Sequence, residues 1–191
     1  MLTLSNPVNA TLGSDSVHTY TITDNENTPT IDFNVVSSSG DESVSAKAIT
    51  VDLSGPSSEI ITVDFAVTGT ATGTGTDYTL LNGTLSIPAG DTTGTITIAN
   101  IVDDTTDESD ETVIVTLSSP NNAALGSDDV HTYTIVDNDN QPTIHFNSAS
   151  STGAEDISSV ALPVDLSAAS SNDITVCLLY TSDAADETVR V

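Results

Sequence analysis

Acidic residues gather in four short clusters of this chain, and carboxylates grouped in this way can bind a metal ion. The clusters are Asp41-Glu42, Asp77 after a Thr/Gly loop, a dense run of Asp103, Asp104, Asp107, Glu108, Asp110 and Glu111, and the closing triplet Asp137-Asn138-Asp139. Unpaired carboxylates that lie close together repel and raise one another's pKa values. A hard divalent cation removes that conflict. Ca²⁺ suits it best, because it takes six to eight oxygen ligands in flexible geometry.

Other metals and a metal-free state are the alternatives. Mg²⁺ demands a tighter octahedron, and the chain has no His or Cys cluster of the kind that binds Zn²⁺. Charge runs also serve simply to solvate loops. The chain could therefore be an acidic, salt-adapted protein with no specific ion.

The segments between the acidic clusters alternate apolar residues with Thr and Ser, which is typical of half-buried strands. Seven such segments are expected, at 30–36, 44–53, 60–67, 83–87, 93–102, 111–117 and 129–136. Prolines and Asn-Gly or Gly-Asp turns separate them. The pattern predicts an all-β fold, a seven-stranded antiparallel β-sandwich of the immunoglobulin type. Alternate loops of such a sandwich lie at the same end, so the four acidic clusters are expected to meet there.

The chain repeats itself at an offset of 113 residues. Residues 4–63 align with 117–176 without a gap, and 38 of the 60 pairs are identical. Val17-His18-Thr19-Tyr20, for example, recurs as Val130-His131-Thr132-Tyr133. A period of this length is the size of a domain rather than of a solenoid repeat. The sequence therefore predicts a tandem array of domains.

The phase of the repeat predicts the domain limits. Residues 1–28 correspond to the end of a preceding domain, 29–140 to one complete repeat, and 141–176 to the beginning of the next repeat. Over residues 177–191 only 2 of 15 positions match the earlier copy. This tail resembles a translated sequencing adapter, and we expect it to be non-native.

Composition excludes several classes of function. The chain has 28 acidic residues against two basic ones, Lys47 and Arg190, and a formal net charge of −26. Nucleic-acid binding requires a basic surface, and no apolar run is long enough for membrane insertion. One cysteine, Cys177, allows no internal disulfide. No nucleophile elbow, His-Glu-x-x-His motif or P-loop lysine is present, so we expect no enzymatic activity.

Several motifs in a fixed order resemble the Calx-β domain. They are Asp77-Tyr78, Gly83-Thr84-Leu85, Pro88-Ala89-Gly90-Asp91, Ile101-Val102-Asp103-Asp104, Glu108 with Asp110-Glu111-Thr112, and Ile135-Val136-Asp137-Asn138-Asp139. The resemblance implies an immunoglobulin-like sandwich with calcium at the end next to the following domain. The ligands that it implies are Glu42, Asp77, Asp103, Asp104, Glu108, Glu111, Asp137 and Asp139.

Asp110 is a weaker candidate in this resemblance, with charge balance as its other role. Asn138 and Thr105 stand where the family pattern has an acid, so fewer or weaker calcium ions are expected. In the neighbouring copies Asp24, Asn25 and Glu26 repeat the closing triplet, and Glu155 repeats Glu42.

The expected function is that of a calcium-binding spacer module in a large extracellular or cell-surface repeat protein, such as a bacterial adhesin. Its expected partners are adjacent repeats of the same chain, with a host or surface receptor or a glycan bound elsewhere in the protein. The alternative is an accessory binding module of a secreted multidomain hydrolase. Glycan binding by this segment itself is disfavoured, because aromatic residues are only 4% and Trp is absent.

Overall fold

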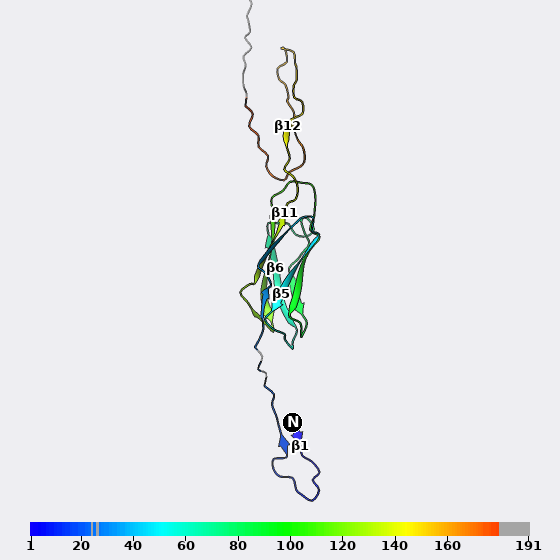
Figure 1. Ribbon diagram of the computed structural model, residues 1–191, viewed down its shortest axis with the longest axis vertical. Helices are drawn as coiled ribbons and strands as arrows, with labels where there is room; N and C mark the ends of the chain where they lie inside the picture. The colour runs from blue at the N-terminus through cyan, green and yellow to red at the C-terminus, as the bar shows by residue number, and fades with distance from the viewer. Residues whose placement is uncertain (24, 26, 180–191) are drawn as a thin grey trace, which may run out of the picture.

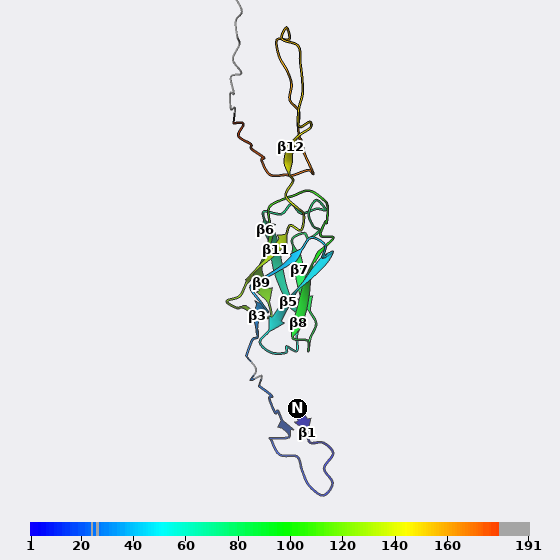
Figure 2. The same ribbon diagram turned by 45° about the horizontal axis from the view of Figure 1, so that its top comes forward.

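The computed structural model describes residues 1–23, 25 and 27–179, and its parts follow one another along one long axis (Figure 1). A two-stranded N-terminal hairpin comes first, a β-sandwich lies in the middle, and a second two-stranded hairpin follows it. Figure 2 shows the same order after rotation. The expectations for Asp24, Glu26 and most of the tail (180–191) lie outside the described residues.

The fold is entirely β in the part of the chain that the structure describes, as the alternating pattern predicts. The strands are β1 (Leu2–Thr3), β2 (Val17–His18), β3 (Thr30–Phe33), β4 (Ser37–Asp41), β5 (Ala46–Leu53), β6 (Ile61–Gly69), β7 (Gly83–Ile87), β8 (Thr93–Ala99), β9 (Glu111–Asn121), β10 (Ala124–Leu125), β11 (Val130–Val136), β12 (Ile144–Phe146) and β13 (Val164–Leu166). None of these residues forms a helix that could cross a bilayer.

Two sheets enclose one hydrophobic core. The first has the order β10-β3-β5-β8, and the second has the order β4-β11-β9-β6-β7. Alternate residues of each strand point inward, so that Val113, Val115 and Leu117 of β9 are buried while their neighbours are not. All buried apolar side chains of the described residues lie between Ile31 and Ile135. The core of the sandwich therefore lies within residues 31–135.

The first expected strand, 30–36, ends earlier than predicted. Only Thr30–Phe33 form β3, which pairs with β5, and the chain then crosses to the other sheet, where Ser37–Asp41 pair with β11 as β4. Val35 and Val36 lie at the crossing and are exposed, so their apolar character does not mark a buried strand. The β4–β11 and β10–β3 pairs are parallel. These two pairs depart from the antiparallel arrangement expected for the sandwich, because β4 and β10 are held by distant backbone partners, while its other strand pairs are antiparallel.

His131 holds the crossing between β3 and β4. Its ring is fully buried, with Nδ1 2.6 Å from the carbonyl oxygen of Val35 and Nε2 2.9 Å from Oγ of Ser38. A buried imidazole needs partners for both nitrogens, and these two come from the segment that changes sheets. His131 is a structural residue on a sheet face, as its place in an alternating strand indicates.

The two outer hairpins reproduce the pairing of the sandwich at the repeat offset. Ile144 pairs with Leu166 in β12–β13 as Ile31 pairs with Leu53 in β3–β5. Leu2 likewise pairs with His18 in β1–β2 as Val115 pairs with His131 in β9–β11. Corresponding residues therefore pair in the same local register in both copies. The division of the chain into repeats remains a proposal.

Candidate metal site

The parallel β4–β11 pair positions the first ligand candidate. Its register runs from Ser37 opposite Thr132 to Asp41 opposite Val136. The next amide, that of Glu42, donates to the carbonyl oxygen of Val136 at 3.2 Å. Glu42 and Asp137 thus leave the sheet side by side, although they are far apart in sequence.

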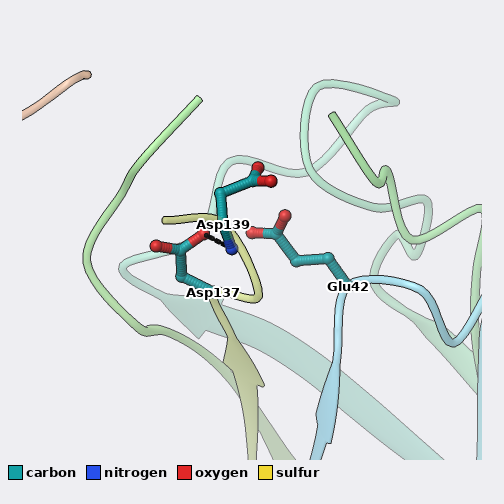
Figure 3. Close-up of side chains that lie close together, drawn as sticks. All are labelled: Glu42, Asp137 and Asp139. Atoms are coloured by element: carbon teal, nitrogen blue, oxygen red, sulfur yellow. Dashed lines mark hydrogen bonds between the residues drawn. The ribbon is translucent and has the colours of Figure 1, made fainter. Parts of the chain in front are cut away.

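The end of β11 carries two more carboxylates. In Figure 3 the side chain of Glu42 points toward Asp137 and Asp139, which come from the chain after β11. The three residues each offer one carboxylate oxygen, and these oxygens lie within 4.8 Å of one another. The amide of Asp139 donates to Oδ1 of Asp137 at 3.1 Å (Figure 3). The turn after β11 therefore brings two carboxylates close to a third.

The loop between β8 and β9 closes over the same end. The amide of Glu108 donates to Oδ2 of Asp137 at 3.1 Å. Asp110 accepts a hydrogen bond from the amide of Asp137 at 3.2 Å. Oδ1 of Asp104 accepts from the amide of Thr106 at 2.6 Å, an Asx-type turn that fixes the loop locally.

Asp77 reaches the site from the loop after β6. Its carboxylate accepts from the amide of Thr72 at 2.5 Å, and its own amide donates to the Thr72 carbonyl oxygen at 3.0 Å. Its carbonyl oxygen accepts from the amide of Val102 at 2.9 Å, which ties the loop to the chain after β8. The following Tyr78 is buried in the core. Asp77 is therefore anchored on both sides.

Gly69, where this loop begins, gives a first testable prediction. It has a φ of 136°, and a Cβ there would lie 2.0 Å from the carbonyl oxygen of Thr112. Gly69→Ala is expected to lower the free energy of unfolding by about 2–4 kcal/mol, because it adds backbone strain to a clash with β9. Urea unfolding measures this change. Gly55→Ala is the control, since a Cβ there meets nothing within 4 Å, and an equal loss in both variants would contradict the prediction.

Half of the predicted ligand residues line one cavity at this end of the sandwich. A cavity of about 150 Å³ at this end is lined by Glu42, Thr76, Asp77, Val102, Asp104, Glu108, Glu111 and Ile135. A larger hollow of about 470 Å³ beside the Asp77 loop is lined by no carboxylate. The structure thus brings five of the ten predicted residues into one cavity and places Asp137 and Asp139 beside Glu42.

Three of the ten predicted residues take positions with other partners. Asp103 accepts a hydrogen bond from the side-chain amide of Asn138 at 3.1 Å. Asp110 accepts a hydrogen bond from the backbone amide of Asp137, as described above.

Thr76 is not among the predicted residues but lines the cavity. A lone threonine in a Thr/Gly loop carries no signal that would have distinguished it.

Crowding of carboxylates in a partly desolvated site alters their acidity. The pKa of Glu42 rises from the ordinary value of 4.5 to about 7, first through burial and then through the negative charges of Asp137, Glu108, Asp104 and Asp139. The pKa of Glu111 also rises to about 7, through burial and then through Asp77. Burial and neighbouring acids raise the pKa values of Glu108 and Asp139 as well. In the absence of a cation, the site favours protonation.

Two features of the described residues favour a bound cation at this site: a buried carboxylate oxygen without a partner, and a shortage of positively charged side chains. Oδ2 of Asp139 is buried and has no hydrogen-bond partner, which is costly for a carboxylate oxygen. Lys47 is the only lysine or arginine among the described residues. Its ammonium lies 5.9 Å from the ring centroid of Tyr133. An all-oxygen donor set of several carboxylates matches the preference of Ca²⁺.

Comparison with known families identifies one family. The family model of the Calx-beta domain matches residues 24–139, a span that contains the whole sandwich. A comparison with curated protein sequences found no match.

Solved structures of similar fold include Calx domains. The apo form of the Calx CBD1 domain is 26% identical, with a TM-score of 0.53, and the alignment covers 59% of this chain and 100% of that domain. The calcium binding domain CBD12 of CALX1.1 is also 26% identical with a TM-score of 0.53, over 62% of this chain and 50% of that one. This chain therefore spans about half the length of CBD12.

Proposed function

Because the chain belongs to the Calx-beta domain family, we propose that residues 29–140 form a calcium-binding module without enzymatic activity. The observation that carries the proposal is the meeting of Glu42, Asp137 and Asp139, with ligand oxygens within 4.8 Å of one another and one oxygen of Asp139 buried without a partner. Ca²⁺ would supply the positive charge that these carboxylates lack.

The proposed ligands come from four separate segments of the sandwich. They are Glu42 after β4, Asp77 after β6, Asp103, Asp104, Glu108 and Glu111 around the loop before β9, and Asp137 and Asp139 after β11. Asp110 and Asn138 support them, because Asp110 binds the amide of Asp137 and Asn138 binds Asp103. A cation at this place would hold these loops together and relieve their repulsion.

The site lies where the sandwich continues into the next segment of the chain. Asp137 and Asp139 are followed within a few residues by Pro142 and then by β12. Figure 1 shows the second hairpin beyond this end of the sandwich. Calcium would thus stiffen the junction between consecutive repeats and fix their relative orientation.

We further propose that the module acts as a spacer in an extracellular or cell-surface repeat protein of the adhesin type. The repeat offset in sequence and the repeated strand registers of the outer hairpins support a tandem arrangement. A module in that location is expected to bind calcium at roughly 10⁻⁴–10⁻³ M. Such a module serves adhesion by presenting other domains at a defined distance.

Isothermal titration calorimetry on the chain tests the calcium site directly. Ca²⁺ is expected to bind with a dissociation constant of roughly 10⁻⁴–10⁻³ M, and Glu42→Gln is expected to weaken binding at least about tenfold because it removes a charged ligand. Glu59→Gln at the opposite end of the sandwich is the matched control. Absence of binding by the unaltered chain, or equal binding by Glu42→Gln, would refute the site.

A further inference from the structure

Asp107 differs from the other acids of its loop. Its side chain is only 6% exposed, whereas Asp103, Asp104 and Asp110 are exposed. A carboxylate is buried at high cost unless hydrogen bonds compensate it. The residues that bury Asp107 therefore make a specific contact with it.

That contact comes from the segment after β13, in the part of the chain assigned to the next repeat. Oδ2 of Asp107 accepts from Oγ of Ser170 at 2.6 Å. The amide of Ser171 donates to the carbonyl oxygen of Asp107 at 3.0 Å, and the amide of Asp107 donates to that of Ala169 at 3.4 Å. Asp107 and Ser170 thus form a parallel β-bridge. Asp107 therefore contacts this segment through both its side chain and its backbone.

A second polar contact lies beside the bridge. Oγ of Ser109 donates to Oδ1 of Asn172 at 3.0 Å. The loop 107–109 and the turn 169–172 together form a contact that we call the Asp107 clasp. In Figures 1 and 2 the orange segment after β13 returns toward the end of the sandwich from which β12 departs.

The receiving turn has a counterpart in the sandwich at the repeat offset. Ser57 corresponds to Ser170, and in both turns the serine hydroxyl accepts from the amide two residues later, that of Glu59 at 3.0 Å and that of Asn172 at 3.1 Å. The two copies differ at that last position, which is Glu in one and Asn in the other. The two turns therefore share the serine and the hydrogen bond that its hydroxyl accepts.

The counterpart turn lies at the end of the sandwich opposite to the loop 107–109. Residues 56–59 connect β5 to β6, at the end opposite to the acidic loops, and a hollow there is also lined by Asn27, Thr28 and Pro29, where the chain enters the domain. Each repeat thus has the loop at one end and the turn at the other. This is the arrangement that a head-to-tail interface between identical units requires.

We propose that the Asp107 clasp is the interface between consecutive repeats, with Asp107 as an interdomain contact rather than a calcium ligand. The loop 107–109 of one repeat binds the serine turn of the next, and the turn 56–59 receives the same loop from a preceding repeat. The partner of this surface is therefore another repeat of the same kind. The clasp consists of hydrogen bonds between protein groups and forms without a metal ion.

Amide hydrogen exchange measured by NMR on the full chain, in EDTA, tests the clasp. The amides of Ser171 and Asp107 are expected to be protected, and Ser170→Ala is expected to increase the exchange rate of the Ser171 amide about tenfold, because it removes the hydroxyl that binds Asp107. Ser57→Ala is the matched control and should leave that rate unchanged. Amides of β9 serve as the internal reference for global stability.

The outcomes separate this proposal from the calcium site. The clasp is supported if Ser170→Ala speeds exchange at Ser171 and leaves calcium binding unchanged. Asp107→Asn, which keeps a side-chain oxygen as acceptor, should retain more protection than Asp107→Ala. The clasp is refuted if the Ser171 amide of the unaltered chain exchanges as fast as an unstructured peptide, or if Ser57→Ala and Ser170→Ala have equal effects.

Discussion

Calcium at millimolar concentration is expected to raise the unfolding midpoint of the chain by about 5–10 °C over its value in EDTA. At about ten times the dissociation constant, one site stabilises the folded state by roughly 1.4 kcal/mol. About 1 kcal/mol corresponds to about 4–8 °C in a domain of this size. The stabilisation should be large because the ion adds attraction and also removes the repulsion that raises the pKa values of Glu42 and Glu111.

Magnesium at matched concentration is expected to produce a smaller shift. Mg²⁺ requires near-octahedral geometry and gives up its water reluctantly, whereas the carboxylates here come from several separate loops. Differential scanning calorimetry in EDTA, Ca²⁺ and Mg²⁺ provides the comparison. Equal midpoints in all three would show that the acids only solvate the loops, and attention would move to the flanking domains.

Removing two proposed ligands should abolish the calcium-dependent shift. Asp104→Ala combined with Asp139→Ala is expected to melt at the same temperature with and without Ca²⁺. In EDTA this variant should melt close to the original chain, because the loss of two repelling charges offsets the loss of the hydrogen bond from the Thr106 amide to Asp104. Glu59→Ala with Asp91→Ala removes the same charge from the opposite end of the sandwich, around the contact between Ser57 and Gly90. This control should keep the shift.

The fold follows from local sequence patterns to a large extent. Alternation of Ile, Val and Leu with Thr is enough to place β5, β6, β8, β9 and β11, because each buries one face and leaves the other polar. The all-β sandwich is confirmed. The same reasoning brings the acidic clusters to one end, since the ends of neighbouring strands in a sandwich meet there.

What the sequence does not reveal depends on contacts between distant residues. β4 has the sequence Ser-Ser-Ser-Gly-Asp and contains no apolar residue, so no periodicity identifies it. It is a strand because β11 offers it a free edge and because His131 binds Val35 and Ser38 on either side of the crossing. Yet this strand is what sets Glu42 beside Asp137.

The role of Asp107 is hidden from the sequence for a similar reason. Six acids occur within nine residues, from Asp103 to Glu111, and nothing in their order marks one as different. The difference arises because the turn 169–172 covers Asp107 and leaves its neighbours exposed. Local pattern predicts that an acidic loop exists, while contact with a distant segment determines which of its acids is buried.

In EDTA, the stability of the chain is expected to fall as the pH rises from about 5 to about 8. Glu42 and Glu111 have pKa values of about 7 in the folded protein, against an ordinary value of 4.5. Between these two values the folded state binds more protons than the unfolded state, so raising the pH favours unfolding. The contribution of these groups is complete below about pH 4.5 and is lost as the pH passes through 7. Thermal unfolding midpoints measured in EDTA at several pH values test this expected fall in stability.

Calcium should remove or reverse this dependence on pH, because the ion and the protons compete for the same carboxylates. The stabilisation by Ca²⁺ is therefore expected to grow from pH 5 to pH 8, when folded protein binds the ion in place of a proton. Glu42→Gln should make the EDTA profile shallower, since a neutral amide neither titrates nor repels Asp137 while Glu111 still titrates, and Glu59→Gln should leave the profile unchanged. A midpoint in EDTA that rises with pH would mean that the carboxylates do not crowd one another in solution, and the electrostatic basis of the calcium site would then fail.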